Sequence, residues 1–396
     1  MRDREIVHLK ILLGIAAGPG LLLALPYLLG ASDYGRIFGF IAFVQLLSLF
    51  SSLGLEVVAA RVDLPIRITF FALAFTTLVA TIAYELVQST PTVFSVASMA
   101  FCTALANNIS LVIQNRYLFN GDTGQYARYG ACRAALLIII LLACIRARID
   151  VETSWAIASV ASIVVAHLIF QSSKKRLEET STKQLPLATI LNTFYAALPM
   201  ATLNSLASLP FIAERLIAKT AFDSELFSKY AICTTLITPM VYIGNMSQNY
   251  LISHNKWIDR PTAIGGAKQL LKLCGGYIVV LFSVGLFILP PYFDNRTDFY
   301  TIATPYTLWV FIYCVASFPL AAVTQKQADA STLAKCAFIS LISVAVLYGF
   351  YEWIYMHGIL FDLPWKAALG SAVLSAAIIV VRWIYVWPLT SSRNIR

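Results

Sequence analysis

The stretch LPFIAERLIAKTAFD, from Leu209 to Asp223, places the ionisable pair Glu214-Arg215 inside a segment that is otherwise apolar. In a bilayer each such residue costs at least about 2.5–3.5 kcal/mol on insertion scales, so it faces a bundle interior or a wet cavity rather than lipid. Neighbouring helical residues point about 100° apart, so the two side chains should meet different partners. Two interpretations follow: the pair is a charged wall of a central cavity, or it makes tertiary salt bridges that only orient helices. Lys219 lies nearer the segment's end, where a lysine can snorkel to the membrane surface.

The composition around this segment is that of a membrane protein. Of the 396 residues, 59% are hydrophobic and only 12% are charged, against about 25% charged residues in soluble domains. The net charge of +9 comes from basic residues that lie between apolar runs, which indicates membrane orientation rather than a nucleic-acid partner. The cysteines are scattered singly, without metal-ligand spacing, so we expect neither a metal nor a cofactor.

Apolar runs of about 20 residues, the length that crosses the hydrocarbon core as a helix, recur along the whole chain. The predicted spans are 11–31, 37–59, 67–87, 92–114, 128–146, 153–171, 192–220, 227–251, 273–291, 301–323, 334–355 and 364–388. Lys and Arg concentrate on one side of these spans, which places both termini in the cytoplasm. The predicted fold class is therefore an all-α polytopic membrane protein with 12 transmembrane helices.

The longest cytoplasmic connection, SSKKRLEETSTKQL, divides the spans into two sets of six. We predict an N-terminal six-helix bundle over 1–171, a cytoplasmic linker over 172–191 and a C-terminal six-helix bundle over 192–396. An even number of spans in each half gives both halves the same orientation, with a repeat axis along the membrane normal. The expected architecture is two pseudo-symmetric bundles around a central cavity.

A short internal sequence similarity between the two halves supports the predicted repeat. ASDYGRIFGFIAF, which starts at Ala31, and FDSELFSKYAICT, which starts at Phe222, both follow the first span of a half. An offset of 192 pairs Ser32 with Ser224 and Asp33 with Glu225. Each stretch therefore reads as an acidic turn at the outer face that leads into the second helix of its half.

Further polar residues interrupt the spans. Arg133 lies at the edge of an apolar run, and Glu56 lies near the inner end of the second span. Arg116 and Arg382 lie near the inner boundary, so we expect both to snorkel. For Asn107-Asn108, within the fourth span, we expect hydrogen bonds between helices.

Proline and glycine mark the first span of each half as a candidate hinge. Because proline removes a helix hydrogen bond and glycine softens the backbone, both helices should kink. The hinge candidates are Gly18, Pro19, Gly20 and Pro26 in the first span, and Pro199 and Pro210 in the seventh.

Three stretches carry a resemblance to a known family. They are LLGASDYGRIFGF (28–40) with the later LGLE (53–56), IQNRYLFNGDTGQYARYGACRAALL (113–137), and ERLIAKTAFDSELFSKYAI (214–232). Together with the topology they resemble bacterial polysaccharide flippases, the O-antigen or Wzx-type translocases of the MATE-like superfamily. In the last stretch Glu214 stands where the family has Asp, and Phe227-Ser228-Lys229-Tyr230 replaces the usual Gly-x-Tyr pattern.

The resemblance implies a transporter rather than an enzyme. Its cargo would be an oligosaccharide linked to undecaprenyl pyrophosphate, moved by alternating access from the cytoplasmic to the periplasmic leaflet of the bacterial inner membrane during O-antigen and lipopolysaccharide synthesis. A cationic central cavity would replace the hydration of the anionic headgroup with charge-assisted hydrogen bonds. The candidate substrate-binding residues are Arg215, Glu214, Arg133, Lys219, Arg36 and Arg116, and the candidates for coupling to Na⁺ or H⁺ are Glu56 and Glu214. The expected partners are the bilayer, the lipid-linked glycan, a counter-ion and the glycan polymerase machinery.

Two other function classes stay open. An ion-coupled exporter of small molecules would share the architecture and would use a buried carboxylate, for which Glu56 or Glu214 could serve. A membrane glycan polymerase or ligase would use the same lipid carrier, but such enzymes commonly place their acid, base or Arg groups in a large outer loop. The outer connections here, such as QSTPT and FDNRTD, are short.

Overall fold

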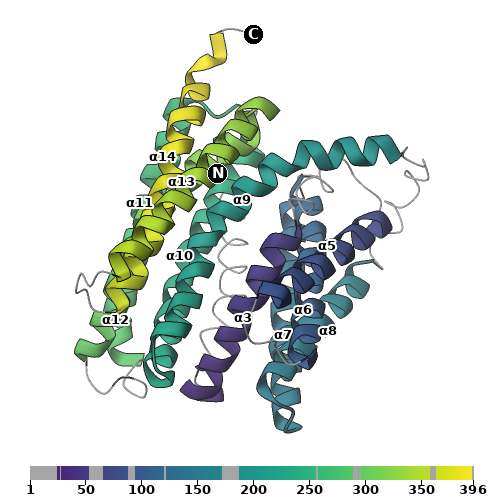
Figure 1. Ribbon diagram of the computed structural model, residues 1–396, viewed down its shortest axis with the longest axis vertical. Coiled ribbons are helices and arrows are strands. Elements are labelled where there is room, and N and C mark those ends of the chain that lie inside the picture. The colour runs from purple at the N-terminus through teal and green to yellow at the C-terminus, as the bar shows by residue number, and fades with distance from the viewer. Residues whose placement is uncertain are drawn as a thin grey trace. The chain divides into compact units, whose positions relative to one another are not determined.

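The helical fold that the sequence predicts is present in a computed structural model (Figure 1). The structure describes residues 25–26, 28–52, 66–87, 94–119, 122–171, 187–255, 257–288, 293, 296–356 and 363–394. Its helices are α3 (Ala31–Ser52), α5 (Ile66–Val87), α6 (Phe94–Phe119), α7 (Thr123–Arg146), α8 (Val151–Gln171), α9 (Leu187–Ala221), α10 (Ser224–His254), α11 (Arg260–Ile288), α12 (Arg296–Gln327), α13 (Ala330–Met356), α14 (Leu363–Val386) and the 3-10 helix η1 (Trp387–Asn394). Within these ranges 8 helices are long and apolar enough to cross a membrane. An all-α, multi-pass membrane protein is thus confirmed, while the count of 12 spans and the cytoplasmic termini stay predictions.

Several predicted features lie outside the described residues. These are Gly18, Pro19 and Gly20 of the first span, Glu56, and most of the linker over 172–191. The two acidic residues of the internal similarity are described: Asp33 lies in the first turn of α3 and Glu225 in the first turn of α10. Their placement at the outer face stays a prediction.

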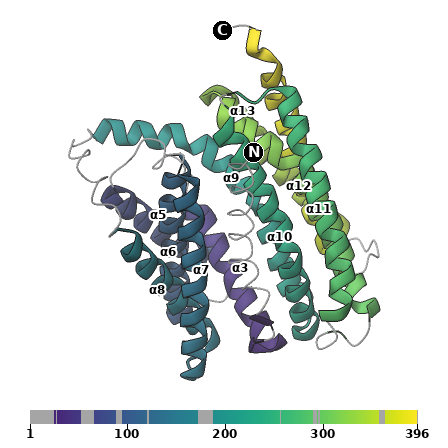
Figure 2. The same cartoon turned by 180° about the vertical axis from the view of Figure 1, so that it is seen from behind.

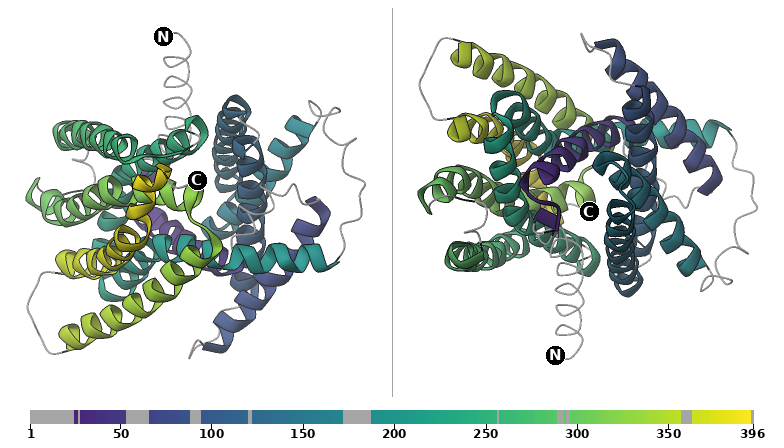
Figure 3. Two further views of the ribbon diagram at one scale, coloured as in Figure 1. Left: turned by 90° about the horizontal axis from the view of Figure 1, so that it is seen from above. Right: turned by 90° about the horizontal axis from the view of Figure 1, so that it is seen from below.

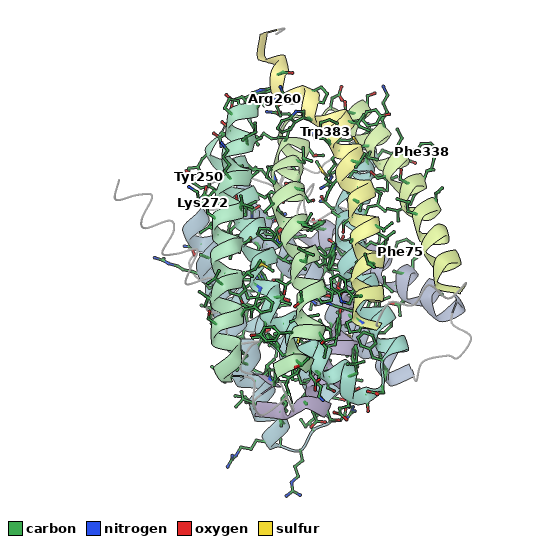
Figure 4. The ribbon with its side chains drawn as sticks, turned by 90° about the vertical axis from the view of Figure 1, so that its left-hand side faces the viewer. Phe75, Tyr250, Arg260, Lys272, Phe338 and Trp383 are labelled. Atoms are coloured by element: carbon green, nitrogen blue, oxygen red, sulfur yellow. The ribbon has the colours of Figure 1, made fainter. Side chains whose placement is uncertain are left out.

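Helix α11 begins at Arg260, well before the predicted start at residue 273. Asp259 caps it, because the amide of Thr262 donates to the Asp259 Oδ1 atom at 3.0 Å. The prediction took the edge of the apolar run as the helix start, but a helix continues beyond the hydrocarbon wherever its backbone bonds are satisfied. Arg260 and Lys272 accordingly lie along one helix, as Figure 4 shows.

The described chain forms two compact units. Unit 1 takes in Arg36–Ser205, and unit 2 takes in Leu22–Gly35 together with Leu206–Arg396. The first residues of α3 thus belong to unit 2, and the first half of α9 belongs to unit 1.

Unit 1 is built from α5, α6, α7 and α8 with most of α3, and these helices lie alongside one another in Figure 2. Asn108 is fully buried and donates from Nδ2 to the Ser51 Oγ atom at 2.8 Å, which joins α6 to α3. The predicted role of the asparagines as bonds between helices is confirmed at this position.

The turn between α7 and α8 is a Schellman motif. The amide of Ile149 donates to the Cys144 carbonyl at 3.1 Å, and that of Arg148 donates to the Ile145 carbonyl at 2.9 Å. Arg148 takes a left-handed conformation with φ of 59°, although glycine usually occupies this position. The turn delivers Asp150 to the start of α8.

Unit 2 is organised around α12, which packs against α10, α11 and α14 (Figure 3). Gly244 of α10 makes the closest of these contacts possible, because a Cβ added there would overlap the Phe318 ring of α12. On the surface of this unit, Phe338 and Trp383 are 64% and 58% exposed, as expected for side chains that face lipid (Figure 4).

One end of unit 2 is fastened by side chains that reach across helices. Lys326 Nζ donates to the Ile252 carbonyl at 3.1 Å, and Gln327 Nε2 donates to the Ile258 carbonyl at 2.9 Å. Arg260 lies over the ring of Trp387 at 5.1 Å, which joins α11 to η1. The end of α12 is therefore tied to the connection between α10 and α11.

Candidate functional site

The Glu214-Arg215 pair of α9 is buried in unit 2. Glu214 is 1% exposed and Arg215 is 9% exposed, so neither side chain faces lipid, as the sequence predicts. Their neighbours come from different helices, in keeping with side chains that diverge around the α9 axis. Glu214 interacts with the phenol of Tyr230 on α10, whereas Arg215 interacts with the phenol of Tyr306 on α12.

The start of α3 completes this polar cluster. Tyr34 is buried, its hydroxyl shares a hydrogen bond with the Thr235 hydroxyl of α10, and it interacts electrostatically with Arg215. The helices approach closely here because residue 35 is glycine: a Cβ at Gly35 would lie 2.6 Å from the Ser228 Oγ atom. Four helices of unit 2 thus contribute to one buried cluster, which we call the α9 charge cluster: Tyr34, Glu214, Arg215, Tyr230, Thr235 and Tyr306.

Aromatic rings surround the α9 charge cluster. Tyr230 packs edge-on against Phe222 at 5.4 Å, and Tyr306 contacts Trp309 at 5.3 Å. Phe211, one turn before the charged pair, lies 4.7 Å from Trp309. The Trp309 Nε1 atom donates to the Ser375 Oγ atom of α14 at 3.1 Å, which fixes the indole in place. Rings of this kind exclude water and strengthen the electrostatic interactions that they enclose.

The α9 charge cluster offers two kinds of chemistry. Among the described residues, the Oε2 atom of Glu214 is buried and accepts no hydrogen bond. A buried acceptor of this type is costly unless it receives a proton or a cation. The guanidinium of Arg215 presents a planar, permanently charged donor group that suits phosphate or carboxylate. The same few residues therefore combine a cation or proton acceptor with an anion-binding group.

A second polar group, which is half-buried, lies in unit 1 around Arg133. Its Nη1 atom donates to the Ser110 Oγ atom at 2.9 Å, and its Nη2 atom donates to the Asn107 Oδ1 atom. Gln114 Nε2 reaches the same Ser110 hydroxyl at 3.5 Å, and Tyr129 lies next to Arg133. Asn107, Ser110 and Gln114 recur at helical spacing, so one face of α6 carries amide and hydroxyl groups toward α7.

Arg36, near the start of α3, lies in an ion network within unit 1. Its Nη2 atom is 3.0 Å from the Asp150 Oδ1 atom and 2.7 Å from the Glu152 Oε2 atom. Partial burial would raise the pKa of Asp150, but the hydrogen bond from Arg36 and its charge outweigh burial and lower the pKa below its ordinary value. Two carboxylates therefore already engage this candidate substrate-binding residue.

The other predicted residues are dispersed. Lys219 is exposed near the end of α9, in keeping with snorkelling, and Arg116 is half-buried in the last turn of α6. Arg382 differs from the prediction: it is 2% exposed, so it does not snorkel. It instead lies inside unit 2, where it interacts with Tyr313 and Cys336, because its helix turns this residue toward α12 and α13.

Three of the predicted proline hinges are described. Pro199 and Pro210 both lie within α9, on either side of the division between the units. Pro26 is buried, and its carbonyl accepts a hydrogen bond from the amide of Gly30 at 3.0 Å. Their role as hinges stays a prediction.

The architecture matches solved transporters. No family model matches the chain, and no curated protein matches it in sequence. A structure described as the outward-facing conformation of a multidrug resistance MATE family transporter of the MOP superfamily aligns with a TM-score of 0.61 over 97% of this chain and 94% of that chain, at 14% identity. The inward-facing conformation of such a transporter aligns with a TM-score of 0.55 over 98% of this chain and 96% of that chain, also at 14% identity. This chain has the fold of MATE transporters.

A third structure with the MATE fold bears on the polar sites. It is a MOP superfamily transporter from Pyrococcus furiosus, described as having a binding pocket of reverse polarity that suggests a different function. It aligns with a TM-score of 0.55 over 98% of this chain and 93% of that chain, at 14% identity. The likeness to these structures shows the fold alone, because function depends on the side chains that each protein places on that fold.

Sequence reasoning found the charged pair but missed the tyrosines that surround it. Tyr306, Trp309 and Tyr313 recur at spacings of three and four residues along α12, which places them on one helix face. That signal was available, but tyrosines in a membrane protein also anchor interfaces, so spacing alone does not separate the two roles.

Proposed function

We propose that this protein is a flippase that moves an oligosaccharide linked to undecaprenyl pyrophosphate from the cytoplasmic to the periplasmic leaflet by alternating access. It would act in the bacterial inner membrane during O-antigen and lipopolysaccharide synthesis and deliver its cargo to the glycan polymerase machinery. The observation that carries this proposal is the burial of Glu214-Arg215 within a transporter fold.

The cost of that burial argues for a functional role. Ionisable residues inside a membrane are expensive and are retained where they contact substrates or ions. A sugar–pyrophosphate headgroup is anionic and strongly hydrated, so its passage requires replacement of water by donors. Arg215 provides such donors, and Tyr230 and Tyr306 provide hydroxyls next to it.

The other candidate substrate-binding residues would contact the headgroup at other stages of its transport. Arg133, held by Ser110 and Asn107, presents a second guanidinium inside the membrane. In this proposal Arg116 and Lys219 attract the headgroup from nearer the membrane surfaces, and Arg36 exchanges its carboxylate partners for the substrate at the outer end of unit 1.

Glu214 is the proposed coupling residue. Because its Oε2 atom accepts no hydrogen bond among the described residues, a proton or Na⁺ can bind there. Binding of the cation would weaken the attraction between Glu214 and Arg215 and so change the affinity of Arg215 for an anion. Glu56 stays a second candidate for this role.

A second function, ion-coupled export of small molecules, has its own support. Two of the similar structures are described as multidrug resistance transporters, and the aromatic rings around Glu214 would also suit an organic cation. A flippase and an exporter differ in which group of the cluster meets the cargo: Arg215 for an anion, and Glu214 for a cation.

The test reconstitutes the purified protein in liposomes that contain lipid-linked oligosaccharide and follows headgroup accessibility to an external glycosidase. Parallel vesicles loaded with organic cations report drug export under a Na⁺ or proton gradient. We expect oligosaccharide movement that the substitution Arg215→Gln abolishes and that Arg260→Gln, at a surface arginine, preserves.

Cation export without oligosaccharide movement would instead identify a drug exporter. Joining of oligosaccharide units in the same vesicles would identify a polymerase or ligase and would also refute the proposal.

A further inference from the structure

Unit 1 contains a groove that the transport site does not use. It has a volume of about 650 Å³, within the range of about 300–1,000 Å³ that ligand pockets occupy. It is formed by α5, α6 and α8, all of which belong to unit 1. Its lining is almost wholly apolar and includes Phe70, Leu105, Ile109, Ile163, Val164 and Leu168.

The length of the groove corresponds to one leaflet. On α6 the lining extends from Cys102 to Ile113, which is about 17 Å at 1.5 Å per residue. Half of a hydrocarbon core of about 30 Å is about 15 Å. A single extended hydrocarbon chain lying in one leaflet would therefore match the groove from end to end.

Thr69 and His167 mark one end of the groove. Thr69 is in the first turn of α5, and His167 is in the last turns of α8. Because α5 and α8 are separated by two spans, they run in opposite directions, and these two residues share the end that the basic residues of the sequence place at the cytoplasm. Because the surface that lines the groove is almost wholly apolar, the groove suits the chain of a lipid rather than its headgroup.

The walls of the groove are stiff. Six of the apolar lining residues are β-branched, namely Ile109, Val112, Ile113, Val160, Ile163 and Val164, and such side chains have few rotamers. A stiff groove favours a chain that loses little conformational entropy on binding. An isoprenoid chain, whose double bonds already restrict it, loses less than a saturated acyl chain.

We propose that this groove holds the isoprenoid chain of the lipid-linked substrate in the cytoplasmic leaflet. This inference rests on the proposed function and adds to it a residence site for the tail. The tail would stay in contact with unit 1 during transport.

The natural thiol of Cys102 provides a direct test, because it is the exposed cysteine of the chain and lines the groove. The protein in nanodiscs is treated with an uncharged, membrane-soluble maleimide, and alkylation of Cys102 is followed by mass spectrometry. Polyprenyl monophosphate at about ten times its Kd should occupy about nine-tenths of the sites and slow alkylation about tenfold. Phosphatidylglycerol with saturated chains should slow it far less.

Equal protection by both lipids would show that the groove binds bilayer lipid in general, and no protection by either would show that it is not a lipid site. Either result overturns the inference, and neither depends on transport.

Transport supplies a second test. The substitution Cys102→Trp fills the groove from an exposed position and should slow oligosaccharide movement several-fold, whereas Leu111→Trp, on the same helix outside the groove, should not. If the wild type moves oligosaccharide and the Cys102→Trp variant moves it equally fast, the inference about the groove is refuted and the proposed function stands. Absence of wild-type movement would instead overturn the proposed function, and the alkylation result would still decide whether the groove binds isoprenoid chains.

Discussion

Removal of the charges of Glu214 and Arg215, singly and together, separates a structural role from a transport role. The substitution Arg215→Gln leaves Glu214 as a carboxylate that is 1% exposed and has lost its neighbouring positive charge. The double substitution Glu214→Gln/Arg215→Gln removes both charges and keeps polar side chains opposite Tyr230 and Tyr306, with the size of Glu214 preserved.

The expected magnitude follows from the burial of the pair. Breaking a buried pair by removal of one partner costs about 3–5 kcal/mol, whereas replacement of both partners is often nearly neutral. At about 1.4 kcal/mol per factor of ten, the single substitution should lower the folding equilibrium constant by roughly two to three and a half powers of ten. The double variant should recover most of this loss.

Two assays on the same preparations distinguish a structural role of the pair from a role in transport. Titration with SDS in mixed micelles measures the free energy of unfolding, and the liposome assay measures headgroup movement. We expect the double variant to be nearly as stable as the wild type yet inactive, because its cluster no longer attracts an anion. Wild-type transport by the double variant would refute the reasoning, since the pair would then serve only to orient helices. Wild-type stability of the single variant would show that the two charges are not coupled.

Three further predictions concern packing and turns. Gly244→Ala should destabilise unit 2 by about 1–3 kcal/mol because its Cβ overlaps Phe318, and Gly130→Ala, with nothing within 4 Å, should not; equal Tm values for the two variants would contradict the packing. Arg148→Gly should stabilise the protein by up to about 1 kcal/mol, because relief of the left-handed strain exceeds the added chain entropy; a lower Tm would argue against strain at this turn. Asn108→Leu should cost about 0.6–1.7 kcal/mol in SDS titration, and no change would show that its bond to α3 contributes nothing.

The overall architecture was readable from the sequence because lipid imposes one strong rule. Apolar runs of the right length must be helices, and the structure has a helix wherever such a run is described, including α6, α8 and α12. Helix ends were harder, since hydropathy marks where lipid stops rather than where the backbone unwinds. The early start of α11 at Arg260, set by the Asp259 cap, illustrates the difference.

The site was readable in part. A charge in an apolar run has a high cost, so Glu214 and Arg215 could be predicted to lie inside the protein. Their partners could not, because the contact of α9 with Tyr230 and Tyr306 depends on how three helices pack. Arg382 shows the same limit: its distance from the membrane surface indicated snorkelling, but the orientation of α14 buries it.

Hydrogen bonds hold the end of α12 to the connection between α10 and α11, so this end of unit 2 can serve as a fixed point for distance measurements. Lys326 binds a carbonyl in the last turn of α10 and Gln327 binds one within the connection, so their region should keep its internal distances through a transport cycle. Spin labels placed near Ile252 and Gln327 should therefore report one narrow separation under every condition. A broader distribution of distances from these labels to a label elsewhere would then reflect displacement of the other site. This end of unit 2 is therefore a suitable fixed point for spectroscopy.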